Sequence, residues 1–236
     1  MTDFVLVHGA WHGAWCWQRV MRGLWAGGHR AFAVSLTGVG ERAHQMAADI
    51  TLATHVADVL AVIDAEELRA CVLVGHSYGG MVITGVADRI DDPATLARLV
   101  YLDAMVPRPG ECWSTTHDPQ TRAARRSAVA ELGHLPAPDP AAFGLSGADH
   151  AWVTRRQTPQ PGSLYDDPLD FDPERVARWP RQFIDCTSPS LATIDVMRQR
   201  VRSDAGWRVD AIATGHDAMI SAPHELLALL DLGAGA

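Results

Sequence analysis

Lysine is absent from this chain of 236 residues, so all of its basic side chains apart from histidine are arginine. A chain without lysine cannot form a Schiff base with a carbonyl substrate, and it cannot supply the lysine of a phosphate-binding P-loop. Positive charge is also in the minority, because 20 arginines stand against 28 acidic residues and give a formal net charge of −8. This balance argues against nucleic acid as a partner, since phosphate binding needs a basic face.

Cysteines are few, and long apolar runs are missing. The cysteines lie far apart and form no C-x-x-C pair, so neither a metal site nor a disulfide framework is expected; they are Cys16, Cys71, Cys112 and Cys186. No apolar stretch approaches the ~20 residues of a membrane-spanning helix, and the N-terminus lacks the pattern of a secretory signal. We expect a cytoplasmic protein with free thiols and no membrane partner; a monomer and a homodimer both stay open.

Apolar runs of strand length alternate with segments of helical periodicity. The predicted strands cover residues 4–7, 31–36, 71–74, 99–102, 182–186 and 209–213, and the predicted helices lie at 15–25, after Thr51, and at 81–90, 194–201 and 223–230. Such alternation predicts an α/β fold with a mostly parallel sheet covered by helices on both faces. The length fits one such domain.

The alternation breaks between residues 106 and 180. Proline, aspartate and arginine interrupt every apolar run there, and the stretch is too long for a structureless loop in a compact domain. We interpret residues 106–180 as a cap inserted into a core formed by 1–105 and 181–236.

A nucleophile motif stands between the third strand and the next helix. Residues 75–79 read Gly-His-Ser-Tyr-Gly, which fits G-x-S-x-G in the strand–turn–helix setting that supports the motif. The turn is sharp, so the residues beside the nucleophile must be small. Ser77 is therefore the candidate nucleophile, and His76 is interpreted as structural. The alternative is a glycine-rich turn with an incidental serine.

Two backbone amides are candidates for stabilising a developing oxyanion. The amide of Tyr78 follows the nucleophile, and the second donor is expected in the loop after the first strand, where Gly9 allows the Ala10 amide to be aimed. The alternative for this loop is a plain strand-ending turn.

One of the 11 histidines stands where a base is needed. His216 lies after the last predicted strand and before the last helix, at the strand end where ligands bind in open α/β sheets. It also follows the serine in the chain, an order that agrees with this fold. The other histidines are interpreted as surface or core residues, except that His12 and His117 could border a pocket.

Three separated segments resemble one group of enzymes. Residues 4–17 look like the opening of the plant methylesterase and hydroxynitrile lyase group of α/β-hydrolases, 75–80 are similar to its nucleophile turn, and 215–219 resemble the segment around its catalytic histidine. The resemblance implies the α/β-hydrolase fold with about six strands and a small helical cap, no cofactor or metal, and small ester substrates.

The chain departs from that group in ways that favour an esterase. The lyases place a lysine after the catalytic histidine and a threonine in the loop after the first strand, where this sequence has Asp217 and Gly9. The plant proteins also carry their catalytic aspartate after the strand that here ends at Cys186, and residues 186–189 contain no carboxylate.

An acid is still needed to orient the imidazole of His216. Asp103 is the first choice, because it ends the strand after the nucleophile helix and some α/β-hydrolases place their acid there. Asp185 is the second, although strand alternation could point it to the wrong face. Asp217 adjoins the histidine and is not expected to reach its Nδ1. The alternative for Asp103 is a strand-end residue that caps a turn.

The cap supplies aromatic and charged side chains that allow two interpretations. Trp113, Phe143, Trp152 and Trp179 could line an apolar site or form the cap's own core. The arginines of the cap could attract an acidic substrate, or they could pair with aspartates at 166, 167, 170 and 172, or face water.

These residues together predict a serine carboxylic-ester hydrolase that takes a small-molecule ester through Ser77, His216 and Asp103. Two alternatives remain: a lyase or another non-hydrolytic enzyme, including a natural-product tailoring step, on the same scaffold, and a binding protein that keeps the fold without turnover.

Overall fold

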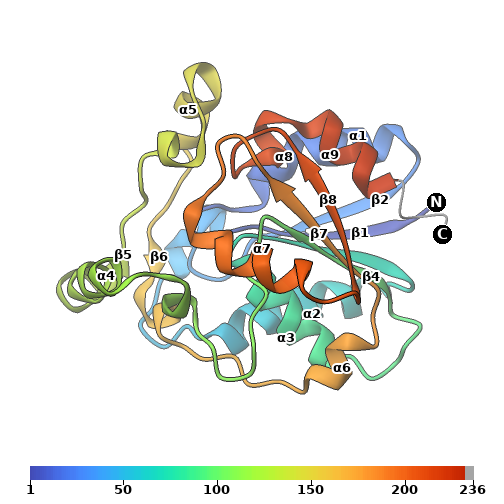
Figure 1. The fold of residues 1–236 in the computed structure, drawn as a ribbon, viewed down its shortest axis with the longest axis horizontal. Coiled ribbons are helices and arrows are strands. Elements are labelled where there is room, and N and C mark those ends of the chain that lie inside the picture. Colours follow the sequence, from blue (N-terminus) through green and yellow to red (C-terminus); the bar gives the residue numbers. More distant parts are fainter. Residues whose placement is uncertain (232–236) are drawn as a thin grey trace.

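A six-stranded parallel sheet forms the centre of the molecule (Figure 1). The computed structural model describes residues 1–231. In spatial order the strands are β2 (Arg30–Val34), β1 (Asp3–Val7), β3 (Cys71–His76), β4 (Leu96–Leu102), β7 (Arg181–Cys186) and β8 (Trp207–Ile212). The helices of this core are α1 (Gln18–Ala26), α2 (Leu52–Ala65), α3 (Gly79–Arg89), α7 (Asp195–Arg202), α8 (Ala218–Ser221) and α9 (Pro223–Asp231).

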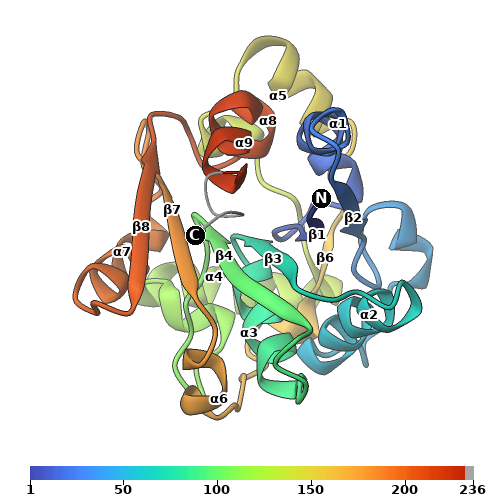
Figure 2. The same ribbon diagram turned by 90° about the vertical axis from the view of Figure 1, so that its right-hand side faces the viewer.

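The apolar core lies in two layers, one on each face of the sheet. Successive strand residues point to opposite faces, so in β1 Phe4 and Leu6 join one layer and Val5 and Val7 join the other. Helices α1, α8 and α9 cover the first layer, and α2, α3 and α7 cover the second. Figure 2 shows α1, α8 and α9 on the side of the sheet opposite α2 and α3.

The predicted sheet and fold class are confirmed. Each predicted strand coincides with an observed one, and Thr51 caps α2 by accepting a hydrogen bond from the amide of Thr54 at 3.3 Å. The boundaries differ by a few residues: β4 begins at Leu96 rather than at residue 99, because the buried polar side chain of Arg98 interrupts the apolar run between Leu96 and Leu99.

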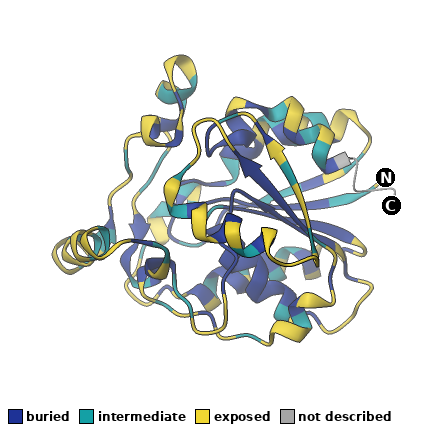
Figure 3. Cartoon of the chain, viewed as in Figure 1, coloured by how far each residue is buried: buried dark blue, intermediate teal, exposed yellow. Residues whose placement is uncertain are grey.

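The cap segment, residues 106–180, adds no strand to the large sheet. Its elements are α4 (Pro119–Leu132), α5 (Gly147–Thr154), α6 (Pro173–Ala177) and an antiparallel pair formed by β5 (His134–Leu135) and β6 (Gln160–Pro161). Helix α4 has no fully buried residue and stands at the edge of the molecule (Figure 3). We propose the division into a core of 1–105 and 181–236 and a cap of 106–180; residues 232–236 lie outside the described part.

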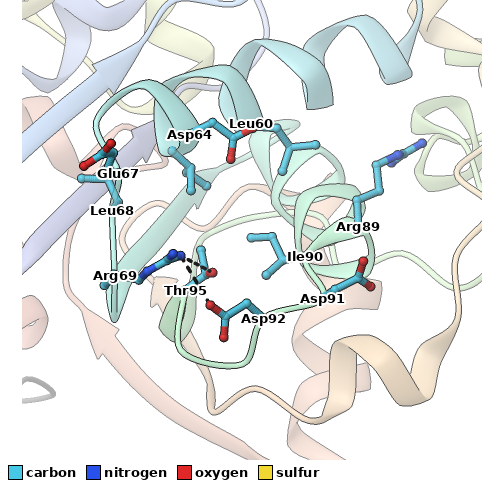
Figure 4. Close-up of a pocket in the computed structure, with 11 residues that line it drawn as sticks. Leu60, Asp64, Glu67, Leu68, Arg69, Arg89, Ile90, Asp91, Asp92 and Thr95 are labelled. Carbon is cyan, nitrogen blue, oxygen red and sulfur yellow. Dashed lines mark hydrogen bonds and ion pairs between the residues drawn. The ribbon is translucent and has the colours of Figure 1, made fainter.

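A cavity of about 840 Å³ opens at the amino-terminal edge of the sheet (Figure 4). It lies between the ends of α2 and α3 and the loop before β4, where Arg69 is 3.4 Å from the hydroxyl of Thr95 and 3.5 Å from Asp92. The nucleophile turn follows the opposite, carboxyl end of β3, so this cavity is separate from the site described below. Among the described residues, no helix has both the length and the apolar character needed to cross a membrane.

Candidate active site

Ser77 stands on a strained turn between β3 and α3. Its backbone φ is +54°, a left-handed conformation that costs a non-glycine residue of order 1–3 kcal/mol. The turn brings α3 close to β1, since a Cβ on Gly79 would lie 2.8 Å from the carbonyl oxygens of Val7 and His8. Ser77 is partly exposed although both of its sequence neighbours are buried. The fold therefore presents this hydroxyl at the carboxyl edge of the sheet.

A buried hydrogen bond joins His216 to Asp103. The ring Nδ1 of His216 lies 2.7 Å from Asp103 Oδ2, and the two side chains are 3% and 0% exposed. Asp103 follows the end of β4, and His216 lies in the loop between β8 and α8. Because a carboxylate only accepts hydrogen bonds, Nδ1 donates and Nε2 is left free to accept a proton. This is the arrangement that a general base needs.

Arg198 holds the other oxygen of the same carboxylate. Its Nη2 donates to Asp103 Oδ1 at 2.7 Å, and its Nε donates to Asp185 Oδ1 at 2.5 Å. Burial lowers the pKa of Arg198, but the charges of Asp103 and Asp185 outweigh burial and raise it. Asp185 also pairs with Arg202. Within residues 1–231, Asp185 therefore bonds arginines of α7 and makes no hydrogen bond to His216.

The loop after β1 lies directly against the nucleophile. A Cβ on Gly9 would be 2.8 Å from the Cβ of Ser77, so any other residue there would collide with the turn. The ring Nδ1 of His8 donates to the carbonyl of Gly9 at 2.7 Å, and its Nε2 accepts from the amide of Leu36 at 3.1 Å. Burial lowers the pKa of His8 to about 3, so the ring stays neutral and keeps this tautomer.

These hydrogen bonds fix the direction of the two candidate oxyanion amides. In a trans peptide the carbonyl and the next amide point in opposite directions. Holding the carbonyl of Gly9 therefore turns the Ala10 amide the other way, and holding the carbonyl of Ser77, which accepts from the amide of Met105 at 2.9 Å, does the same for Tyr78. Among residues 1–231 neither the Ala10 nor the Tyr78 amide donates a hydrogen bond. Both are free to bind an oxyanion.

A buried ion pair connects the loop after β1 to the histidine loop. The ring Nδ1 of His12 donates to the carbonyl of Ala10 at 2.8 Å, and its Nε2 lies 3.3 Å from Asp217 Oδ2. Burial disfavours the charged form of both side chains, but the charge of the partner outweighs the effect of burial in each case. The pKa of His12 is raised by Asp217, and that of Asp217 is lowered to about 2, chiefly by His12. The pair ties the two halves of the site together.

His76 supports the histidine loop from the nucleophile turn. Its Nε2 donates to the carbonyl of His216 at 3.1 Å and lies 3.5 Å from Asp217 Oδ1. Burial and the neighbouring His216 hold the pKa of His76 well below its usual value, so the ring is neutral. In the described part of the chain, His76, His216 and Asp217 are the one group of three or more histidine, cysteine and acidic side chains close enough to share a metal ion. The sequence predicts no metal or cofactor, and the hydrogen bonds of both rings fit structural and proton-transfer roles.

An aromatic wall extends from His216 into the cap. Phe143 lies 5.5 Å from the ring of His216, Trp11 is 6.2 Å from Phe143, and Trp113 is 5.3 Å from Trp11 and 5.6 Å from Tyr78, measured between ring centroids. Two of the four cap aromatics considered from the sequence therefore lie at the site. The other two lie elsewhere: Trp152 packs against Trp15, and Trp179 points its indole nitrogen at the carbonyl of Ala87 on α3.

His117 borders the cap side of this wall. The hydroxyl of Tyr165 lies 3.3 Å from its Nδ1, and the ring of Trp113 lies 6.1 Å away. Burial, with the charge of Arg125, lowers the pKa of His117 to about 4. It is a neutral hydrogen-bonding group at neutral pH.

Three features of the site were not found from the sequence. Arg198 was not singled out, although Arg198 and Arg202 are spaced four apart on α7 and so share a helix face toward Asp185. The pairing of His12 with Asp217 was not predicted either, because 205 positions separate two residues that carry no shared motif. Arg125 is one of several arginines in the cap, and its sequence neighbours do not distinguish it from the others.

The fold and these contacts define an α/β-hydrolase. The model of the alpha/beta hydrolase family matches residues 4–229, and the chain belongs to this family. It is an enzyme with carboxylesterase-like relatives, which confirms the resemblance described above.

The relatives include esterases of bacteria and plants. The chain is 39% identical over 236 residues to a carbendazim hydrolyzing esterase of Nocardioides sp. (strain SG-4G), covering 96% of this chain and 97% of that one. It is 27% identical to methylesterase 10 of Arabidopsis thaliana, covering 98% of this chain and 90% of that one. An extracellular alpha/beta-hydrolase from a Paenibacillus species has the same fold, with a TM-score of 0.85 at 19% identity and full coverage of both chains.

Proposed function

We propose that the chain is a serine carboxylic-ester hydrolase that works through an acyl-enzyme. Ser77 is the nucleophile, His216 the general base and acid, Asp103 the residue that orients it, and the amides of Ala10 and Tyr78 the oxyanion donors. The observation that best supports the proposal is the buried 2.7 Å hydrogen bond between His216 and Asp103. It lies beside the nucleophile turn and beside two backbone amides that donate no hydrogen bond within residues 1–231.

The proposed reaction has two halves. Ser77 Oγ attacks the ester carbonyl carbon while its proton moves to His216 Nε2, and the two amides bind the negative oxygen. The bond to the alcohol oxygen then breaks as His216 protonates it, which leaves the acyl group on Ser77. Water attacks this acyl group, gives a proton to His216, and the acid leaves as Ser77 recovers its hydrogen.

The finer choice between hydrolysis and cyanide chemistry rests on the residues beside the nucleophile. The position after His216, which is a lysine in the lyases, is Asp217 in this chain. Its carboxylate is buried and paired with His12, so this position supplies no cation. Gly9 has no hydroxyl to offer and no room for one, because a Cβ there meets Ser77. Both observations favour an esterase over a hydroxynitrile lyase.

We expect methyl and short-chain acyl esters to be hydrolysed and mandelonitrile to release no cyanide above background. The panel includes carbendazim, because the 39% identical relative is named for its hydrolysis. Acid release is followed by pH-stat and cyanide by a colorimetric assay, with Ser77→Ala as the blank. Cyanide release that depends on Ser77 would identify a lyase, and no Ser77-dependent cleavage of any ester would overturn the proposed function.

The ion pair of His12 and Asp217 makes the stability of the protein depend on pH. The raised pKa of His12 means that its contribution is complete below about pH 6.5 and is lost as the pH rises through the folded value. The lowered pKa of Asp217 means that its contribution is present above about pH 4 and is lost as the pH falls toward 2. The pair therefore stabilises most between about pH 4 and 6.5.

His12→Asn is expected to reduce the free energy of unfolding by about 3–5 kcal/mol at pH 5.5, as when one partner of a buried pair is removed. Asparagine can still donate to the carbonyl of Ala10, so the change removes mainly the charge. The difference from wild type should narrow by pH 9. Urea unfolding at both pH values measures it, with His150→Asn as a control because that histidine pairs with Asp139 at the surface. A difference independent of pH would show that the buried pair is not ionised.

A further inference from the structure

Arg125 places a cation inside an aromatic cluster beside the candidate active site. It lies on α4 of the cap segment, and its side chain is half-buried. The central carbon of its guanidinium group lies 5.2 Å from the ring centroid of Trp113, 5.4 Å from that of Trp11 and 5.7 Å from that of Tyr165. These distances are short enough for three cation–π contacts.

The guanidinium group of Arg125 has no acidic partner in the part of the chain that the structure describes. No ion pair or hydrogen bond joins it to residues 1–231, and its Nη1 is buried without an acceptor. Burial lowers the pKa of Arg125. The next residue, Arg126, differs completely, because its guanidinium makes a two-point contact with Asp166 at 2.8 and 2.9 Å on the surface. Among the described residues, Arg125 therefore lacks the acidic partner that its neighbour Arg126 has.

An unpaired cation at such a position has an unfavourable free energy unless a ligand supplies an opposite charge. Removing a charge from water is unfavourable when no opposite charge or acceptor replaces the water. Contacts with aromatic faces offset part of this cost, but they leave the in-plane N–H groups without acceptors. A carboxylate is the natural complement, because its two oxygens match the planar fork of the guanidinium group.

The same aromatic rings connect Arg125 to the reacting groups. Trp11 directly follows Ala10, which supplies one oxyanion amide, and its own amide is fixed by a hydrogen bond to Gln160 Oε1 at 2.9 Å. Trp113 contacts the ring of Tyr78, which supplies the other amide. A continuous series of ring contacts therefore links the residues of both candidate oxyanion amides to Arg125.

We propose that Arg125 binds a second carboxylate of the substrate, one that takes no part in the reaction, and that the enzyme prefers monoesters of dicarboxylic acids. This rests on the proposed function of Ser77. The aromatic rings suit an apolar or aromatic spacer between the two carbonyl groups. Arg125 then acts as a specificity residue that recognises the far end of the substrate.

The test compares each monomethyl ester of a dicarboxylic acid with its dimethyl ester. The series runs through increasing chain length and includes monomethyl terephthalate, since the structure does not fix the spacer. We expect kcat/KM for the best monoester to exceed that for its diester by about tenfold or more, the range of a hydrogen bond to a charged group. In Arg125→Met the ratio should fall to one or below, and Arg125→Lys should keep part of the preference.

Arg126→Met is the matched control, because it removes a neighbouring cation of the same helix that already has its own aspartate. It should leave the preference unchanged, whereas loss of the preference in this variant would point to general attraction by the charged surface and overturn the proposal. A wild-type enzyme without preference for any monoester, or a preference that survives Arg125→Met, would overturn it as well. Melting curves check the fold of each variant.

Failure of the proposed function gives a different pattern. If neither ester of any pair is cleaved, the hydrolase assignment fails, and binding alone tests Arg125. Calorimetric titration of the Ser77→Ala protein with monomethyl terephthalate then supports the carboxylate site if binding is present and is lost in the Ser77→Ala/Arg125→Met double variant. Absence of binding, or equal binding by both proteins, would overturn it.

Discussion

Ser77→Ala is expected to lower kcat by about 10⁵–10⁶-fold on any ester that the wild-type protein hydrolyses. Without the hydroxyl no acyl-enzyme can form, and His216 has no proton to accept from the nucleophile. The oxyanion amides of Ala10 and Tyr78 remain, so a small rate above the uncatalysed reaction should persist. Single-turnover and steady-state rates on the best ester of the panel measure this loss.

The fold should survive this change. Alanine at position 77 meets the same backbone strain as serine, since φ is +54° for either side chain, and the turn stays anchored by the hydrogen bonds of its backbone to Leu102 and Met105. We therefore expect a melting temperature close to that of the wild type. A kcat loss accompanied by unfolding would say nothing about a nucleophile, and the melting curve separates the two cases.

Covalent labelling identifies the same residue directly. A fluorophosphonate should add once to the wild-type protein, and peptide mapping should find it on Ser77. Ser203→Ala is the control, because that hydroxyl donates to the carbonyl of Arg200 at the surface and should not affect labelling. A label on another serine, or retained labelling in Ser77→Ala, would contradict the assignment.

Most of the correct predictions from the sequence rest on local patterns, that is, on short apolar runs and on the residues of turns. Strand β1 is a short apolar run followed by histidine and glycine, and β3 is one that ends in glycine and histidine. The segment around Ser77 contains the glycines of its own turn, so neighbours in the chain suffice to recognise all three. The position of Asp103 at the end of the strand beside β3 follows from the parallel topology. This is why a residue 26 positions after Ser77 could be proposed for the site.

Contacts between distant charged groups could not be predicted in this way. Arg198 meets Asp103 across 95 positions, and His12 meets Asp217 across 205, with no periodicity that marks either pair. The arginines of the cap show the same limit. Arg126 forms an ion pair with Asp166, which is one of the interpretations that the sequence allowed. Its neighbour Arg125 packs against aromatic rings instead, because consecutive side chains of α4 point about 100° apart.

Asp103→Asn is expected to preserve the fold and to lower kcat by about 10⁴-fold at neutral pH. Arg198 adds a second effect to the loss of charge, because it fixes the orientation of the asparagine amide. Its guanidinium group can only donate, so the amide oxygen of an asparagine must face Arg198 at the position where Asp103 Oδ1 now accepts at 2.7 Å. The amide NH₂ must then face His216.

This orientation inverts the tautomer of the histidine. A donating NH₂ at 2.7 Å requires Nδ1 of His216 to accept, which places the ring proton on Nε2, where it cannot take a proton from Ser77. The loss should therefore appear in kcat rather than in KM. A packing defect would act through a stability change of ~0.5–3 kcal/mol and would appear in the melting curve.

Asp185→Asn is the matched comparison, because Asp185 contacts the same arginine without touching His216. Its amide oxygen can still accept from Arg198 Nε, and Asp103 and Asp195 keep the guanidinium group paired, so we expect less than about a tenfold loss in kcat. If Asp185→Asn were the inactive variant and Asp103→Asn the active one, the acid would lie after the later strand, as in the plant methylesterases. If both variants stayed active, a carboxylate would not be needed to orient His216, and the site would work as a serine–histidine dyad.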